Sequence, residues 1–204
     1  MARPPDPDLE DRILKAARKL WKKGAERALT MRAIAQAAGT NTPAVYRRFA
    51  CREDIQRALL QRTKDEVFRQ LQNAPSVEKA CERYLDFAES HPHEYELYYV
   101  HEYKLLFSAR AKQMTASKLT FKQKRPAVQL MEGKLAAQLG GAPDDYLSVT
   151  LTIWALLHGT AMLLLTKMVP PEHRAEMREA CRASLQTLLR ESRAPQTGPP
   201  SKKG

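Results

Sequence analysis

Residues 30–49 combine small apolar side chains with a cluster of polar and cationic ones, in the sequence TMRAIAQAAGTNTPAVYRRF. The apolar residues predict packing between two short helices, and Gly39 permits a tight turn between them. The other side chains supply hydroxyl, amide, phenol and guanidinium groups, which suit phosphates and base edges. None is acidic; they are Thr40, Asn41, Thr42, Tyr46, Arg47 and Arg48. The segment therefore predicts a helix-turn-helix with a cationic outer face.

Caps and breakers indicate the helices that would position this segment. The first helix is expected from Asp8 to Gly24. Thr30 is expected to cap the second helix and Thr42 the third, and a fourth helix begins at residue 52. Longer helices follow, with expected ranges 76–90, 93–110, 115–139, 143–168 and 171–192. This pattern predicts an all-α fold of about nine helices.

The composition agrees with a helical globular protein that has an anionic partner. Of the 204 residues 43% are hydrophobic and 28% charged, and strong helix formers dominate. The net charge is +11, and the first 60 residues carry 13 Lys and Arg against 7 Asp and Glu. This balance favours nucleic acid or an anionic surface as partner. Residues 1–7 and 193–204 are rich in Pro, Gly or Lys and are expected to be disordered.

Residues 13–60 closely resemble the DNA-binding domain of the TetR/AcrR family of bacterial regulators. The most specific runs are LTMRAIAQAAG, VYRRF and REDI, and WALLHGTAMLLL is similar to the family's penultimate helix. The resemblance implies a helix-turn-helix domain over 8–54 and a ligand-binding and dimerisation domain over 55–192. It also implies a homodimeric transcriptional regulator, most often a repressor. Such a dimer binds a palindromic double-stranded DNA operator and releases it when a small-molecule inducer binds.

The resemblance also assigns roles by position within the helix-turn-helix. The residues at the family's phosphate-contacting positions are Thr40, Asn41, Tyr46, Arg48 and Arg52. Thr30 matches a helix cap close to a phosphate. Arg47 is the best candidate for reading a guanine, and the other base-facing positions are Thr42, Pro43 and Ala44. Pro43 and Ala44 stand where the family often has Gly and Thr, so base preference is expected to differ.

Cys51 stands where the family usually has a serine at the start of the fourth helix. The helix dipole and Arg52 could lower the pKa of this thiol and make it redox-sensitive, or the cysteine is a tolerated substitution. The three cysteines form no close-spaced pair, which suggests a reducing compartment. The sequence therefore predicts no disulfide framework, metal site or cofactor.

Two apolar stripes in the last two helices predict a four-helix dimer interface. Its expected residues are Leu151, Trp154, His158, Ala161, Leu165, Cys181, Leu185 and Leu188. The first of these helices lies in a stretch, residues 146–166, without Asp, Glu, Lys or Arg, long enough to cross a bilayer. Because the stretch contains Ser, Thr and His, we interpret it as a buried helix and expect a cytoplasmic protein without membrane insertion.

The ligand site is the least specific prediction. Residues 95–107 are rich in tyrosine, and aromatic side chains at helical spacing either fill a core or line a cavity. In the second interpretation the lining residues are Tyr99, Tyr103, Phe107 and Met114. No nucleophile elbow, phosphate loop or di-metal spacing is present, so no enzymatic activity is expected. The alternative is a helical small-molecule-binding or interaction protein that has lost specific DNA recognition.

Overall fold

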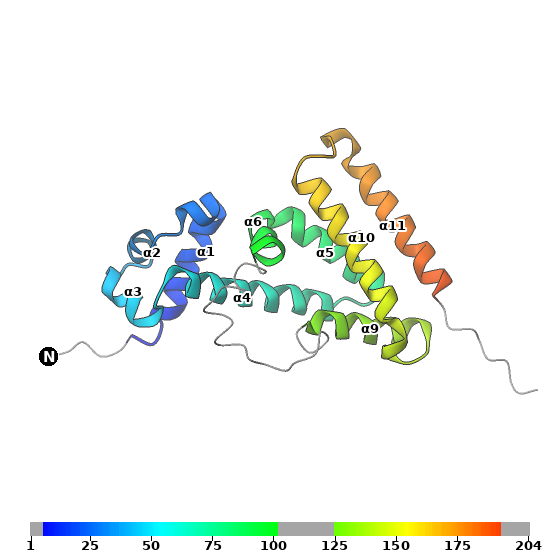
Figure 1. Ribbon diagram of the computed structural model, residues 1–204, viewed down its shortest axis with the longest axis horizontal. Helices are drawn as coiled ribbons and strands as arrows, with labels where there is room; N and C mark the ends of the chain where they lie inside the picture. The colour runs from blue at the N-terminus through cyan, green and yellow to red at the C-terminus, as the bar shows by residue number, and fades with distance from the viewer. Residues whose placement is uncertain (1–5, 102–124, 193–204) are drawn as a thin grey trace, which may run out of the picture. The chain divides into compact units, whose positions relative to one another are not determined.

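The computed structural model describes residues 6–101 and 125–192, and all regular structure in these ranges is helical (Figure 1). The described ranges contain nine α-helices with short 3-10 and π-helical turns, which confirms the predicted fold class. By chain packing the protein divides into two compact units. The first comprises Met1–Val67 and His91–Ser117, and the second Phe68–Ser90 and Lys118–Gly204.

The first unit contains the predicted helix-turn-helix. Its elements are α1 (Leu9–Ala28), α2 (Met31–Ala37), α3 (Thr42–Arg48), the first part of α4 (Arg52–Gln72), α6 (Pro92–Glu96) and the π-helical turn η1 (Leu97–His101). Each of the first four helices turns apolar side chains into one core, and those fully buried there include Ile13, Ala17, Trp21, Ile34, Val45 and Ile55. Burial of each large apolar side chain contributes about 1.5–3 kcal/mol, so this core fixes the positions of α2 and α3.

The turn between α2 and α3 depends on the backbone of Gly39. Its φ of +65° lies in the left-handed region, and a Cβ at this position would meet nothing within 4 Å. Gly39 N donates to Gln36 O at 3.2 Å, and Thr40 N donates to Ala35 O at 2.9 Å. These two bonds form a Schellman motif, in which glycine provides the left-handed residue. Glycine is therefore needed at position 39 because of its backbone conformation, as the predicted turn requires.

Side-chain caps start both helices of the motif. Thr30 Oγ1 accepts from Ala33 N at 3.1 Å, as predicted for α2. For α3 the predicted cap was wrong by one residue, because Asn41 Oδ1 accepts from Ala44 N at 2.9 Å. Asn41 has the extended backbone of a cap, with φ −102° and ψ 158°. Thr42 is instead the first helical residue; Asn is at least as good a cap as Thr.

Helix α1 contains the break predicted at Gly24 but does not end there. Gly24 and Ala25 leave helical dihedrals, with φ of −160° and +47°, and the helix then continues to Ala28. Ala25 is one of two non-glycine residues with positive φ in the described ranges. Since the left-handed region disfavours alanine, this kink is held by its surroundings. Helix α1 therefore reaches four residues beyond its predicted end.

The second unit is a helical assembly around α10. Its elements are the end of α4, α5 (Val77–Ser90), α9 (Pro126–Leu139), α10 (Leu147–Leu165) and α11 (Arg174–Glu191). Helix α10 packs against α5, α9 and α11. The end of α4 is held by Lys134, whose Nζ donates to Gln72 O at 3.1 Å and to Ala74 O at 2.6 Å. These bonds satisfy carbonyl groups that a helix end leaves without intrahelical partners.

Helix α10 is the most apolar element of the described ranges. Together with the preceding 3-10 turn it forms Pro143–Leu165, with a mean hydropathy of 1.6 and 33% of its most apolar window buried. Its length and composition would allow it to cross a membrane, but helices in soluble cores pass the same criterion. Among the large apolar side chains of α10 only Leu163 is exposed, at 39%, and the others are buried or half-buried.

The predicted interface residues on α10 and α11 divide into two groups. Ala161, Cys181 and Leu185 are buried within the chain itself, so these side chains serve the core of the second unit. Those that keep partial exposure are Leu151, Trp154, His158, Leu165 and Leu188. The Arg125 guanidinium lies 5.0 Å from the centre of the Trp154 ring, and burial lowers the pKa of His158. The predicted stripes thus combine inward-facing and outward-facing positions.

Candidate nucleic-acid interface

The outer face of α3 presents the polar groups predicted from the sequence. Tyr46 is 52% exposed, the most exposed aromatic side chain in the described ranges. Thr30, Asn41, Pro43, Arg47 and Arg48 are exposed, and Thr40, Thr42 and Arg52 are half-buried. The structure therefore places these nine predicted residues at the surface of one unit, on α3, at the N-terminus of α2, in the turn between α2 and α3, and at the start of α4.

Ala44 is a correction to the predicted set. Its side chain is only 4% exposed and belongs to the core of the first unit. Ala44 follows Pro43 in the first turn of α3, where the helix period directs it toward the other helices. This methyl group is therefore not available to a base edge, and the departure from the family's threonine is a packing feature.

The three arginines of the predicted interface differ in their partners. Arg48 donates from Nη2 to Asp6 O at 3.0 Å, and Arg52 Nη2 lies 3.1 Å from Glu26 Oε1. Within the described residues Arg47 makes no hydrogen bond or ion pair. A guanidinium already held in place suits a fixed phosphate contact, whereas an unengaged one can form two new bonds with a base edge. These contacts distinguish the two side chains, and the separate roles of Arg47 and Arg48 stay predictions.

Of the two interpretations of Cys51, a redox-sensitive thiol or a tolerated substitution, its surroundings favour the second. Burial raises the pKa of the Cys51 thiol, and interactions with the carboxylates of Glu53 and Asp54 raise it further. A bond involving the Asp54 backbone acts in the opposite direction but does not dominate. A lowered pKa was expected from Arg52 and the helix dipole without these two neighbouring carboxylates, so that alternative is not supported. Cys51 is accordingly a weak candidate for a thiolate switch.

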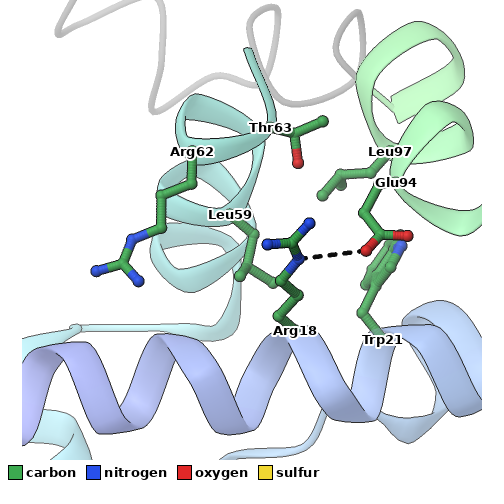
Figure 2. A pocket seen from close by; sticks show the side chains of 7 residues that line it. All are labelled: Arg18, Trp21, Leu59, Arg62, Thr63, Glu94 and Leu97. Atoms are coloured by element: carbon green, nitrogen blue, oxygen red, sulfur yellow. Dashed lines mark hydrogen bonds and ion pairs between the residues drawn. The ribbon is translucent and has the colours of Figure 1, made fainter. Parts of the chain in front are cut away.

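Behind the helix-turn-helix, α1, α4 and α6 meet at a small pocket (Figure 2). Glu94 of α6 is 3% exposed and contacts two cations of α1: Arg18 Nε at 3.2 Å and Lys22 Nζ at 3.0 Å. Arg18 also binds Glu66 of α4 at 2.8 Å. Trp21 adds a neutral link, since its Nε1 donates to His93 O at 2.7 Å. Polar contacts therefore join three helices of the first unit at one point.

The electrostatics of this junction favour a charged Glu94. Burial alone raises the pKa of its carboxyl group, but the hydrogen bond and charge of Lys22, together with Arg18, lower the pKa below the ordinary value. Neither Glu94 nor Arg18 was predicted as a functional residue. They are 76 positions apart, and no local pattern in either segment indicates the pairing.

The predicted ligand site can be followed at one residue. Tyr99 is half-buried in η1, with its ring centre 4.5 Å from that of Tyr95 and 4.2 Å from that of Tyr98. Tyr95 is fully buried, so part of this aromatic segment fills the core of the first unit. The other three predicted residues, Tyr103, Phe107 and Met114, lie outside the described residues. The cavity interpretation therefore stays a prediction.

Comparison with protein families assigns both halves of the chain. Residues 13–59 match the bacterial regulatory proteins of the tetR family, and residues 77–188 match the tetracyclin repressor-like C-terminal domain. The second match alone covers more than half of the chain. The chain therefore belongs to the TetR family of transcriptional regulators, in which an N-terminal helix-turn-helix accompanies a C-terminal helical domain.

Solved structures show the same fold at low sequence identity. A protein of unknown function from Rhodococcus sp. RHA1 is 18% identical, with a TM-score of 0.68 over 95% of this chain and 100% of its own. A TetR-family transcriptional regulator from Streptomyces coelicolor is 20% identical, with a TM-score of 0.60 over 90% and 98%. The multidrug binding protein EbrR complexed with ethidium is 19% identical, with a TM-score of 0.60 over 90% and 99%. Comparison with curated proteins gives no significant match.

Proposed function

We propose that this protein is a one-component repressor that binds a palindromic operator as a homodimer and releases it when a small molecule binds. The observation that carries the proposal is the outer face of α3, where the side chains of Tyr46 and Arg47 are exposed. The Schellman motif at Gly39 fixes the direction in which α3 leaves the turn. Neither an enzyme nor a helical adaptor needs this acid-free polar face. Phosphate contacts by Thr30, Thr40, Asn41, Tyr46, Arg48 and Arg52 would set the register for base contacts by Thr42, Pro43 and Arg47. Such a regulator acts in the cytoplasm.

A homodimer is supported by the apolar surface of α10. The helix has a mean hydropathy of 1.6 and only one third of its most apolar window is buried, so several of its apolar side chains stay partly accessible to a second copy. The half-buried residues Leu151, Trp154, His158, Leu165 and Leu188 are the proposed contacts with a second copy. Two-fold symmetry would present two α3 helices to successive major grooves, which requires a palindromic operator.

A small-molecule effector is supported by the family and by its solved members. EbrR was solved with ethidium, and a TetR protein from Acinetobacter baumannii with minocycline. In this chain the proposed lining includes Tyr99, Tyr103, Phe107 and Met114. Ligand entry would act on α6 and α4, and the junction of Glu94 with Arg18 and Glu66 would carry the change to α1.

The test is selection of random duplex DNA by the purified protein at physiological salt, for the wild type and Arg47→Ala. The expected result is an enriched palindrome. Loss of Arg47 should cost about 1–3 kcal/mol, roughly 5- to 150-fold in affinity, and relax the preference at one base pair in each half-site. Tyr46→Phe removes a phosphate donor and should weaken all sequences alike.

Lys79→Ala is the matched control, because it removes one positive charge from α5 in the second unit and should leave operator affinity unchanged. An enriched sequence that Arg47→Ala binds as tightly as the wild type would contradict the assigned role of Arg47. Failure of ligand-stripped, refolded protein to enrich any sequence would favour the alternative, a helical binding protein that no longer recognises DNA.

A further inference from the structure

Asp6 places a negative charge beside a proposed phosphate contact of the helix-turn-helix. Its main-chain oxygen accepts a hydrogen bond from Arg48 Nη2 at 3.0 Å, and Arg48 is the last residue of α3. Because DNA is a polyanion, a carboxylate at this position repels it and by itself weakens binding. Asp6 therefore lowers DNA affinity unless its contacts within the protein offset this repulsion.

Both carboxylate oxygens of Asp6 have partners that fix the main chain before α1. Oδ1 accepts from Asp8 N at 3.0 Å, which forms an Asx-turn, and Oδ2 binds Arg12 Nη1 at 2.6 Å. The Asp6 side chain is 32% exposed and that of Arg12 44%, so solvent screens the ion pair and it adds little to stability. Its effect is instead geometric, because it fixes the carbonyl group that accepts from Arg48.

Arg12 extends this network to the end of α2. Its Nε donates to Ala38 O at 3.4 Å, and Ala38 is the C-cap residue directly before Gly39. The bond supplies a partner for one of the carbonyl groups that a helix end leaves without intrahelical partners. Through Arg12 and Asp6, the start of α1 therefore connects the end of α2 with the end of α3.

The bond to Asp6 holds the Arg48 guanidinium without using all of its donors. A guanidinium has several N–H groups, so a bond from Nη2 to Asp6 O leaves others that can bind a phosphate oxygen. An arginine that moves freely in the unbound protein loses side-chain entropy when it contacts DNA, and one that is already held loses less. The contact with Asp6 therefore lowers the free-energy cost of a phosphate contact by Arg48.

We propose that Asp6 and Arg12 are positioning residues for DNA binding, which hold Arg48 and the end of α3 in place for a phosphate contact. Asp6 acts through Arg48, and Arg12 acts through Asp6 and the end of α2. This role rests on the proposed function, in which Arg48 contacts a phosphate. It has an unusual sign, since neutralising Asp6 makes the protein more cationic and yet weakens its binding to DNA.

The experiment measures the affinity of variants for two duplexes by fluorescence anisotropy at physiological salt. One duplex is the palindrome enriched by the wild type, and the other is a random sequence of equal length. Asp6→Ala removes the Asx-turn and the ion pair, and should weaken binding to both by about 2- to 10-fold, the usual cost of immobilising one long side chain. Asp6→Asn retains the Asx-turn oxygen and should weaken binding less. Arg12→Lys keeps the charge but lacks the planar fork that binds Asp6 and Ala38 O, and should also weaken binding.

Glu10→Gln is the matched control, because it removes the same charge from an exposed position in the first turn of α1. This variant should bind DNA as tightly as the wild type or slightly more tightly. A double variant separates positioning from a general loss of stability. In an Arg48→Ala background, Asp6→Ala should no longer weaken binding, because the side chain that it positions is absent.

The proposal is overturned if Asp6→Ala binds DNA more tightly than the wild type, as the loss of a negative charge alone predicts. It is also overturned if Asp6→Ala weakens binding equally with and without Arg48, or if Arg12→Lys binds as the wild type does. Failure of the proposed function gives a different result: the wild type then enriches no palindrome, while the random duplex still tests the role of Asp6. A wild type that binds neither duplex would overturn both proposals.

Discussion

At position 39 the backbone, and not the surrounding space, requires glycine. An added Cβ would meet no atom within 4 Å, but φ is +65°. We expect Gly39→Ala to lower the free energy of unfolding by about 1–2 kcal/mol, the cost of a left-handed alanine. Chemical denaturation with urea, followed by circular dichroism, measures this change. Operator affinity should fall as well, because the turn sets the direction of α3.

Gly133 is the matched control for this prediction. It lies within α9, its φ is not in the left-handed region, and a Cβ there also meets nothing within 4 Å. Gly133→Ala should therefore stabilise the protein by about 0.5–1 kcal/mol. Equal effects of the two substitutions would mean that the Gly39 dihedral carries no strain and that the turn tolerates alanine.

The roles of single residues in the helix-turn-helix were predictable where they depend on nearby residues in the sequence. Thr30 is a hydroxyl cap directly before an apolar helical pattern, and its bond to Ala33 N follows from that spacing. The choice between Asn41 and Thr42 was not decided by the sequence, because both are good caps and lie next to each other. Ala44 was placed at a base-facing position by the family resemblance alone, and no local pattern showed that its side chain packs inward.

At the scale of elements, Glu94 makes the junction of α6 with α1 sensitive to acid. Its folded-state pKa lies below the unfolded value near 4.5. The unfolded state therefore binds the proton first, so this carboxylate stabilises the fold above pH 4.5 and loses that effect as pH falls further. We expect Glu94→Gln to lower the free energy of unfolding by about 1–2 kcal/mol at pH 7. The difference from the wild type should shrink below pH 4.5.

Urea denaturation at a series of pH values measures this difference. Glu96→Gln serves as the control because Glu96 is half exposed and lies 3.9 Å from His93. Its effect should stay within about 0.5 kcal/mol. A constant difference between Glu94→Gln and the wild type from pH 7 to pH 3 would refute an ionised, paired Glu94.

Element order and approximate bounds followed from periodicity, capping and breaking residues, as α5 and α11 illustrate. By contrast, the sequence did not show which faces of α10 and α11 point inward and which point outward. Apolar residues occur on most sides of α10, so a stripe at spacings of three and four mixes Ala161, which is buried, with Trp154, which is half-buried. Only the positions of the packed neighbours α5 and α9 separate the two sets.

For the whole molecule, the proposed dimer can be tested by a substitution at a position that makes no packing contact within one chain. Gly159 is exposed on α10, and a Cβ there would meet nothing within 4 Å. Gly159→Arg should leave the fold of one chain intact but introduce a charge between two copies. We expect the dissociation constant of the dimer to rise by at least about 10-fold, measured by sedimentation, with a parallel loss of palindrome binding.

Gly133→Arg provides the comparison, since it adds the same side chain at another helical glycine with open space. This variant should remain dimeric. If Gly159→Arg stays dimeric at the concentrations where the wild type does, the surface of α10 around residue 159 is not the interface.

Contacts between distant parts of the chain set the limit of sequence-based prediction. The helix-turn-helix is a local structure, because its caps and its turn join residues three to five positions apart. The ion pair between Arg178 and Glu89 depends on how α11 packs against α5. Likewise, Asp6 accepts from Arg48 across 42 positions. Neither contact has a signature in either of the two segments that it joins.

The two tryptophans of this chain form a pair of separate optical reporters. Trp21 is buried in the first unit with its indole N–H bonded to His93 O, whereas Trp154 is half-buried in the second unit beside Arg125. Each unit therefore has one intrinsic fluorophore, and the surroundings of the two indole rings differ in polarity. In a Trp154→Phe variant the fluorescence of Trp21 reports the unfolding of the first unit, and in a Trp21→Phe variant that of Trp154 reports the unfolding of the second. No added label is needed.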